Sequence, residues 1–457
     1  MKLISTLWQK MTQSLGLLGQ LLLDLFRKHL VHAAILAALL LLPSYRFYDL
    51  EENIYDSQLK VKHLLGNWVR PSVPPDIAII GIDDQARRAD SSGRLNKMPP
   101  ISRSYLADLL RAIQGWKPKA IVLDVFLDHP AEQAADDLAL EKSIRGVRDK
   151  GIPVVFACRL GTTGGMRAPL LPVHPYLDTA NPLVGNAHVM ASSVDGVIRR
   201  AAVATPVLKE AELVTILQAG MEDQLRFYQL DASRPGDGAY YFWTLAGVAL
   251  LSSEEEAQRA QLLRMLKSAP FLIDFSTHPS HVYASYSSAQ VLSGNLDGSL
   301  VSGRIVLIGV NGSESPDRHP TPLSARSLSV EQYWSLEPVY EQQFSGTEIQ
   351  AYIIHTLESQ LRATGGIREA STFPLLALGL GLGIAVLTTL NRLTLGAWAA
   401  LVICIPVVYV VVATLLFQVS AVYLPILRPI AAYLLATGIG FGILTARLNH
   451  ASEGELK

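Results

Sequence analysis

Four aspartates stand at or just beyond the ends of apolar, strand-like segments, where carboxylates could do chemistry. Asp83 and Asp84 close the segment DIAIIGIDD, and Asp124 and Asp128 come at the end of AIVLDV and just after it. In an open parallel sheet, ligands bind in the crevice at the carboxyl ends of the strands. Carboxylates gathered there could hold a divalent cation or act as acid and base. The alternative, which the spacing alone favours, is that each caps the helix or loop after it.

Other residues give weaker signals for a site. Asp317 lies in the loop VNGSESPDRHPTP, where an aspartate commonly organises a turn. Arg200, which follows DGVIR, could bind an anion, although a solvated or internally paired role is the simpler interpretation. The eleven histidines include no HExxH spacing; His278 and His281 would be a weak metal pair. We expect no metal, no cofactor and no catalytic residue.

Strands and helices alternate in the middle of the chain, and the strands are almost continuously apolar. Such strands are typical of a mainly parallel sheet covered by helices, an α/β fold. The first predicted elements are strand 76–83, helix 102–114, strand 120–125, helix 136–150 and strand 153–157. The later ones are paired strands 188–194 and 201–207 around the turn Asp195-Gly196, helices 208–227 and 241–266, strands 271–275 and 304–309, and helix 347–362.

Composition indicates a membrane protein, because 49% of the 457 residues are hydrophobic and only 17% are charged. A wholly soluble domain carries more charge, and a disordered chain is less hydrophobic. Four segments are long and apolar enough to cross a bilayer. They are residues 29–47, 373–390, 395–417 and 422–446, so one predicted span precedes the α/β region at 49–372 and three follow it. A secretory signal peptide is the competing interpretation of the first, and an uncleaved anchor is favoured.

Charge is distributed unevenly, and this predicts the orientation in the membrane. Residues 49–372 hold 30 of the 39 Lys and Arg and 37 of the 40 Asp and Glu, a net charge of −7. The basic residues outside this range lie mostly beside the predicted spans. Their positions place the N-terminus, the turn at Arg392 and the C-terminus on the cytoplasmic side. Residues 1–28 are predicted to form an amphipathic cytoplasmic leader, which could lie on the membrane interface or equally dock on a partner. Residues 447–457 are predicted to form a short cytoplasmic tail. No basic stripe indicates nucleic acid.

The middle of the chain resembles the type-2 CHASE domain, an extracellular sensory module of bacterial signalling receptors. The resemblance extends over about 310 residues. No single motif is specific, but their order is. The matching segments are Tyr48-Asp49, Tyr55-Asp56, DIAIIGIDD, Pro100-Ile101-Ser102-Arg103, Asp124-Val125-Phe126-Leu127, Gly185-Asn186-Ala187-His188, Asp195 to Arg200, GRIVLIGV, Asp317 with Thr321-Pro322-Leu323, and Gly346 to Ala351. The sequence departs from the family at Gln350, where His is usual, and at 324–343, which looks like an insertion.

The resemblance implies a multi-pass protein of the bacterial inner membrane with residues 49–372 outside the cytoplasm. It implies that Asp83, Arg103, Asp124, Asp317 and Glu348 are framework or pocket-lining residues; Asp84 and Arg200 are weaker candidates. Family members usually continue into a cytoplasmic output domain, but only 11 residues follow the last predicted span.

We therefore expect a sensor that binds an extracytoplasmic ligand and relays a signal through its helices to a separate effector. The expected partners are the lipid bilayer, the ligand and the effector, and a homodimer stays open. The alternative function is a non-catalytic scaffold or accessory subunit of an envelope complex. The sensor hypothesis also predicts a concave pocket at the strand ends.

Overall fold

The computed structural model describes residues 45–66, 75–96, 101–163, 166–170, 176, 183–193, 195–209, 239–265, 270–313, 315, 317–324, 343–362, 367–388 and 395–438. The chain divides into two compact units. The first, called the terminal unit below, combines Met1–Gln58 with Arg368–Lys457. The second, called the central unit, is Leu59–Ile367. Each unit is described by itself.

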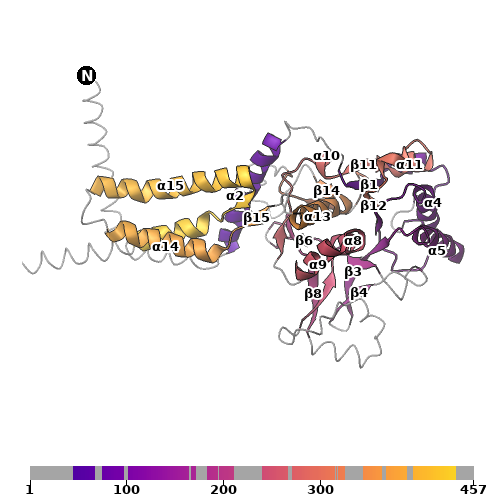
Figure 1. The fold of residues 1–457 in the computed structure, drawn as a ribbon, viewed down its shortest axis with the longest axis horizontal. Helices are drawn as coiled ribbons and strands as arrows, with labels where there is room; N and C mark the ends of the chain where they lie inside the picture. Colours follow the sequence, from indigo (N-terminus) through magenta and orange to yellow (C-terminus); the bar gives the residue numbers. More distant parts are fainter. Residues whose placement is uncertain are drawn as a thin grey trace, which may run out of the picture. The chain divides into compact units, whose positions relative to one another are not determined.

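A mainly parallel sheet forms the middle of the central unit (Figure 1). Its strands follow the order β11-β1-β12-β2-β3-β4, and β5 also pairs with β3. Only β3 and β4 pair antiparallel within it. The strands are β1 (Ile77–Ile82), β2 (Ala120–Asp124), β3 (Val154–Thr163), β4 (Met166–Leu170), β5 (Val184–Asn186), β11 (Ala284–Ser287) and β12 (Ile305–Val310). The predicted mainly parallel sheet is confirmed.

Helices cover both faces of this sheet, with α4 (Arg103–Ile113) and α5 (Ala134–Arg148) on one side and α8 (Leu245–Ser253) and α13 (Gly346–Leu361) on the other (Figure 1). Ile80 and Leu123 belong to a buried apolar cluster that includes Leu106 of α4 and Ile144 of α5. On the other face, α13 packs against β1 and β12, while α8 packs against β2 and β3. Alternate residues of each strand pack against the two helical layers, because successive side chains of a strand point to opposite faces of the sheet.

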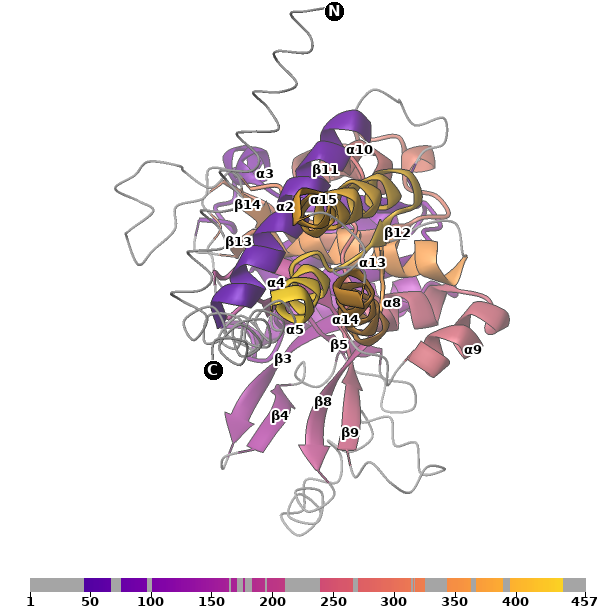
Figure 2. The same cartoon turned by 90° about the vertical axis from the view of Figure 1, so that its left-hand side faces the viewer.

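The pairing of residues 190–209 differs from the prediction. The turn at Asp195-Gly196 is present, with Gly196 at φ +73°, but the strands beside it are short. They are β6 (Met190–Ala191) and β7 (Ile198–Ala201). The next strand, β8 (Ala204–Lys209), pairs with β9 (Ala239–Trp243) instead, so the expected pairing of 188–194 with 201–207 is wrong. The pairs β3–β4 and β8–β9 extend side by side (Figure 2).

The predicted helix 241–266 is also wrong in its first part and in its continuity. Residues up to Trp243 form β9, whose aromatic side chains favour a strand. Thr244 then caps α8 by accepting a hydrogen bond from the Gly247 N–H. Extended backbone at Glu254 separates α8 from α9 (Glu256–Arg264). The predicted helix 208–227 starts inside β8, and the rest of it lies outside the described residues.

Several short elements of the central unit were not predicted. They are α3 (Asp84–Ala89), α10 (Pro279–Val282), α11 (Ser288–Leu292), the 3₁₀ turn Gly298–Leu300, and the pair β13 (Arg318–Pro320) with β14 (Gln343–Ser345). The predicted strand 271–275 is reduced to β10 (Phe271–Leu272), which pairs with β7. A 22-residue helix, α2 (Tyr45–Gly66), was also not predicted, and it includes the residues at which the two units divide.

The terminal unit contains two long apolar helices, α14 (Thr372–Thr388) and α15 (Leu395–Ser420). Among the described residues, Ala400–Ser420 is the one helix that is long and apolar enough to cross a membrane. Thr372–Val386 is apolar but shorter. Val422–Tyr423 form β16, parallel to β15 (Arg368–Glu369), so the predicted span 422–446 becomes helical only at residue 427. The predicted span 29–47 lies outside the described residues up to 44, as do the leader 1–28 and the tail 447–457.

Candidate functional site

Three neighbouring strands of the central unit end at the same edge of the sheet, and most of the predicted site residues lie there. β1 ends at Ile82, β12 at Val310 and β2 at Asp124. Gly309 of β12 lies directly beside Asp124 in the register of the sheet. We call this region the carboxyl edge.

Asp83 and Asp84 connect the end of β1 to its neighbours. Asp83 caps α3 by accepting a hydrogen bond from the Ala86 N–H at 2.8 Å. The same oxygen accepts a bond from the Ser287 hydroxyl at the end of β11, at 2.7 Å. Asp84 accepts bonds from both the backbone N–H and the hydroxyl of Ser313, which follows β12. These bonds lower the pKa of Asp84. Asp83 therefore caps α3 and bridges to β11, as the simpler interpretation expected, whereas Asp84 bridges to the segment after β12.

Asp124 has a different environment. Its carboxyl group is largely removed from water and accepts a hydrogen bond from one hydroxyl group. The Thr347 hydroxyl, in the first turn of α13, donates a hydrogen bond to Asp124 Oδ2 at 2.8 Å. Desolvation raises the pKa of Asp124 to about 7, against the effect of that bond and with a smaller contribution from the charge of Asp317. Gly309 permits this contact, because a Cβ there would lie 2.0 Å from the Thr347 hydroxyl oxygen.

Asp317 brings a second carboxylate to the beginning of α13. Its side chain packs against Gly346, where an added Cβ would lie 2.2 Å from Asp317 Oδ2. His319 Nε2 lies 2.8 Å from Asp317 Oδ1, and 56% of the Asp317 side chain remains exposed. Asp124 and Asp317 thus form a pair of carboxylates, one desolvated and one exposed, beside the first turn of a helix. Within the described ranges, no three His, Cys, Asp or Glu residues are placed to hold a metal ion together.

Arg103 lies at the start of α4 and fixes the loop after β2. Its side chain is buried, and it donates hydrogen bonds to the carbonyl oxygens of Ile101 at 3.2 Å and His129 at 2.9 Å. Its Nε lies 3.7 Å from Asp137 Oδ1. In the same loop, Asp128 is bound by Arg159 at 2.9 Å. Arg103 is therefore a framework residue of the carboxyl edge.

Glu348 lies at the carboxyl edge, whereas Arg200 lies in a different sheet. Glu348 completes a capping box with Ser345 at the start of α13, and it also accepts a hydrogen bond from the Tyr283 hydroxyl at 2.9 Å. Arg200 lies in β7, which belongs to a small sheet with β6 and β10 rather than to the main sheet. The structure thus places Glu348 beside Thr347 on α13 and Arg200 in a separate sheet.

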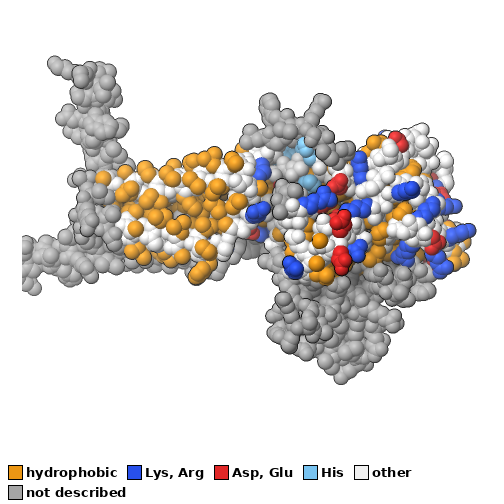
Figure 3. Space-filling model, in the orientation of Figure 1, with side chains coloured by type: hydrophobic (Ala, Val, Ile, Leu, Met, Phe, Trp, Pro, Cys, Tyr) orange, Lys and Arg blue, Asp and Glu red, His pale blue; other side chains and the backbone are white. Residues whose placement is uncertain are grey.

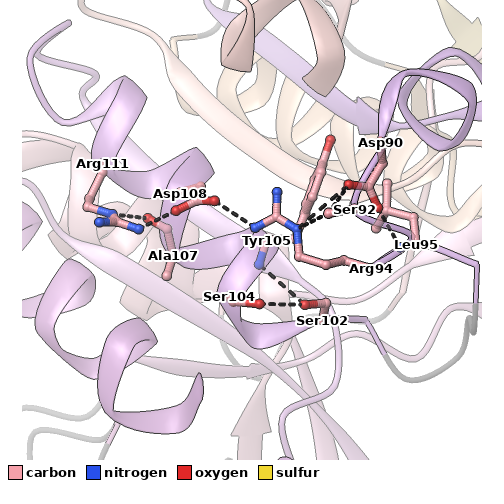
Figure 4. A network of polar contacts seen from close by, with 10 residues as sticks. All are labelled: Asp90, Ser92, Arg94, Leu95, Ser102, Ser104, Tyr105, Ala107, Asp108 and Arg111. Carbon is pink, nitrogen blue, oxygen red and sulfur yellow. Dashed lines mark hydrogen bonds and ion pairs between the residues drawn. The ribbon is translucent and has the colours of Figure 1, made fainter. Parts of the chain in front are cut away.

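The sequence reasoning missed a polar network on the segment that connects α3 to α4 (Figure 4). Arg94 lies 2.6 Å from Asp108 of α4 and stacks over the ring of Tyr105, 5.2 Å from its centroid. Asp90 accepts hydrogen bonds from the Leu95 N–H and from a serine hydroxyl in the same turn. The Tyr105 hydroxyl bonds to Ser288 of α11. The only sequence signal was the turn Asp-Ser-Ser-Gly, in which Gly93 adopts φ +71°.

A second network, which the sequence reasoning also missed, lies in the terminal unit. Glu51 of α2 accepts hydrogen bonds from the backbone N–H groups of Ile426 at 2.6 Å and Leu427 at 2.8 Å, where the helix at 427–438 begins. It also accepts one from the Tyr423 hydroxyl of β16 at 2.7 Å. The rings of Tyr55 and Phe417 pack edge to face beside Tyr423. This network ties α2, α15 and the last described helix together.

The terminal unit also contains a small apolar cavity of about 30 Å³, lined by residues of α14, α15 and the helix at 427–438. It is much smaller than the roughly 300–1,000 Å³ of a typical ligand pocket, and its lining consists of aliphatic side chains, prolines, a glycine and two tyrosines. It is therefore not the pocket that the sensor hypothesis requires, and a concave pocket at the carboxyl edge stays a prediction.

Comparison with known proteins identifies the family. The family model described as the CHASE2 domain matches residues 32–390, which is more than half of the chain. No match was found among the curated proteins or among the solved structures. The chain therefore belongs to the CHASE2 domain family of extracellular sensory domains.

Proposed function

We propose that this chain is a multi-pass sensory protein of the bacterial inner membrane. In this proposal it binds a ligand outside the cytoplasm and relays the signal through its helices to a separate effector. The observation that carries the proposal is the match to a sensory domain family over residues 32–390. The ligand, the relay and the topology go beyond that match and need tests of their own.

The apolar surface of the terminal unit supports anchorage in a membrane. Side chains of α14 and α15 such as Phe373, Ile384, Val408 and Val419 are exposed. Figure 3 shows hydrophobic side chains covering these helices, whereas charged side chains gather on the central unit. Exposed apolar helices without charges are stable in lipid rather than in water. The basic residues beside the predicted spans support the orientation in which residues 49–372 are extracytoplasmic.

Asp124 and Asp317 are the best-supported candidates for contact with a ligand. Asp83, Asp84 and Glu348 are committed to capping and bridging bonds, whereas Asp317 is exposed and Asp124 keeps part of its surface accessible. Carboxylates in this setting would attract a cationic group or accept hydrogen bonds from a hydroxylated molecule. We propose that they bind and do not catalyse.

A thermal-unfolding screen of the full chain in lipid nanodiscs tests ligand binding. The probes are a panel of polyamines, amino acids and sugars, which present ammonium or hydroxyl groups. A probe that binds only the folded protein and is present at a concentration of 100 times its Kd raises the free energy of unfolding by about 2.7 kcal/mol. We expect Asp124→Asn to lose this stabilisation, and Asp149→Asn, at the exposed C-cap of α5, to keep it. Equal stabilisation of Asp124→Asn and wild type would remove the site from the carboxyl edge.

The Glu51 network supports the relay, because hydrogen bonds of defined geometry connect α2 to β16 and to the helix that begins at residue 427. A ligand changes signalling only if it prefers one of two arrangements of such an element. Proximity labelling from the C-terminal tail, with and without a stabilising probe, tests for the separate effector. A labelled cytoplasmic protein whose yield changes with the probe supports the relay.

A scaffold or accessory subunit of an envelope complex remains the second candidate function. It is favoured by the observation that most carboxylates of the carboxyl edge already have protein partners. The same labelling, performed from the central unit instead, distinguishes the two. Envelope proteins whose labelling yield stays the same with every probe would favour the scaffold function.

A further inference from the structure

Four histidines from three elements gather in the central unit, apart from the carboxyl edge. His63 lies in the last turn of α2, His278 and His281 belong to the cap and last turn of α10, and His355 lies in α13. The rings of His63 and His278 are stacked, with centroids 5.8 Å apart and planes inclined by 20°. The rings of His278 and His281 meet edge to face at 6.3 Å.

Hydrogen bonds determine which ring nitrogens can take up a proton. His63 Nδ1 faces the Ser276 carbonyl oxygen at 3.3 Å, so this nitrogen donates, and Nε2 is left to titrate. His278 Nδ1 accepts from the Ser280 N–H at 3.3 Å and from the Ser280 hydroxyl at 2.7 Å, and in this way it caps α10. An acceptor nitrogen must be unprotonated, so a proton on His278 Nδ1 removes the cap.

The charged groups around the cluster oppose one another. Asp274, which is buried, and Asp76 favour protonation of His355, whereas Arg362 and His281 oppose it. Lys62 lies beside His63 in the chain. Burial lowers the pKa of Lys62, although the charge of Asp274 acts in the opposite direction. Burial is the largest effect on both His63 and His355, and it lowers their pKa values. His278 lowers that of His63 further. This packing therefore disfavours charge on the rings of His63 and His355.

We propose that this histidine cluster senses protons: acidification charges the stacked rings, drives His63 and His278 apart and removes the cap from α10. Two imidazolium rings repel each other, whereas two neutral rings stack favourably. α10 leads directly into β11, whose Ser287 holds Asp83, so the change would reach the carboxyl edge. His63 is part of α2, the helix that enters the terminal unit. The stimulus is the proton itself, and the proposal does not depend on a ligand at Asp124.

Hydrogen exchange of the full chain in nanodiscs, with EDTA present to exclude metals, tests the proposal. The measurement compares the protection of amides 276–283, corrected for intrinsic exchange, at about pH 7.5 and about pH 5.5, on either side of the ordinary pKa of histidine. We expect wild type to lose protection by about tenfold for each unit by which opening raises a histidine pKa.

Two substitutions remove the response without removing the packing. His278→Asn can still cap α10 but does not titrate, and His63→Phe can still stack but carries no charge. The double variant should show the same protection at both pH values, and His188→Asn, an exposed histidine outside the cluster, should respond as wild type does. Unchanged wild-type protection, or a double variant that still responds, would overturn the proposal. If the double variant does not fold, a His278→Asn response equal to that of wild type overturns it.

Discussion

Replacing Asp124 with asparagine should change how the stability of the central unit depends on pH. The pKa of Asp124 rises from 3.8 to about 7 on folding, because the carboxylate loses its contact with water. The folded protein therefore binds more protons at Asp124 than the unfolded chain does between these values, so the contribution of Asp124 to stability is fully present below about pH 4 and is lost as the pH rises through 7. At about 1.36 kcal/mol per pKa unit, the loss amounts to at most about 4 kcal/mol.

Two opposing effects reduce this figure without reversing it. The first turn of α13 favours a nearby negative charge by up to about 2 kcal/mol. Asp124 as a residue is only partly buried, so nearby water screens some of the charge. Asparagine has nearly the same shape as the protonated acid and never becomes charged. The variant should therefore equal wild type at about pH 4 and be more stable at about pH 8, by roughly 2–4 kcal/mol.

Urea unfolding of the full chain in nanodiscs, read by pulse proteolysis of the central unit, measures these free energies. Thr347→Val is the companion variant, because it removes the one hydroxyl that stabilises the charged form. This substitution should lower the free energy of unfolding by about 1.5–3 kcal/mol when Asp124 is charged and by much less when Asp124 is neutral. In the Asp124→Asn background its cost should not depend on pH. The reasoning is refuted if Asp124→Asn keeps the wild-type slope from about pH 5 to about pH 8.

Three further predictions use contacts elsewhere in the chain. Gly309→Ala places a Cβ 2.0 Å from the Thr347 hydroxyl oxygen, and it should lower the urea midpoint by the equivalent of about 1–3 kcal/mol. Asp195→Asn breaks a buried bidentate pair with Arg199 and should cost about 3–5 kcal/mol at neutral pH. Burial opposes the charge of Asp195, but Arg199 lowers its pKa overall, so wild-type stability from this pair is lost as the pH falls. Glu51→Ala uncaps the helix at residue 427 and should speed amide exchange in its first turn, by about tenfold for 1.4 kcal/mol.

The main elements of the central unit were predictable because their signals are local. The segments at β1, β2 and β12 are apolar except for Asp124 at the end of β2, and they are fully or almost fully buried, as strands covered on both faces must be. The start of α13 was predictable because Ser345 and Glu348 cap it from within one turn. The segment 239–264 was not, because its change from strand to helix depends on a distant partner: Thr244 donates its N–H to the Val203 carbonyl oxygen.

The candidate site divides in the same way. The sequence by itself determined that acidic residues follow the strands, and that parallel strands would place them at one edge. It could not determine that β12 lies between β1 and β2, because strand order depends on how distant segments pack. The bond from Thr347 to Asp124 joins residues 223 positions apart. Only the tertiary structure decided which carboxylates are stabilised in their charged form by hydrogen bonds and which one is left desolvated, because burial and hydrogen-bond partners depend on how the chain packs and not on the order of its residues.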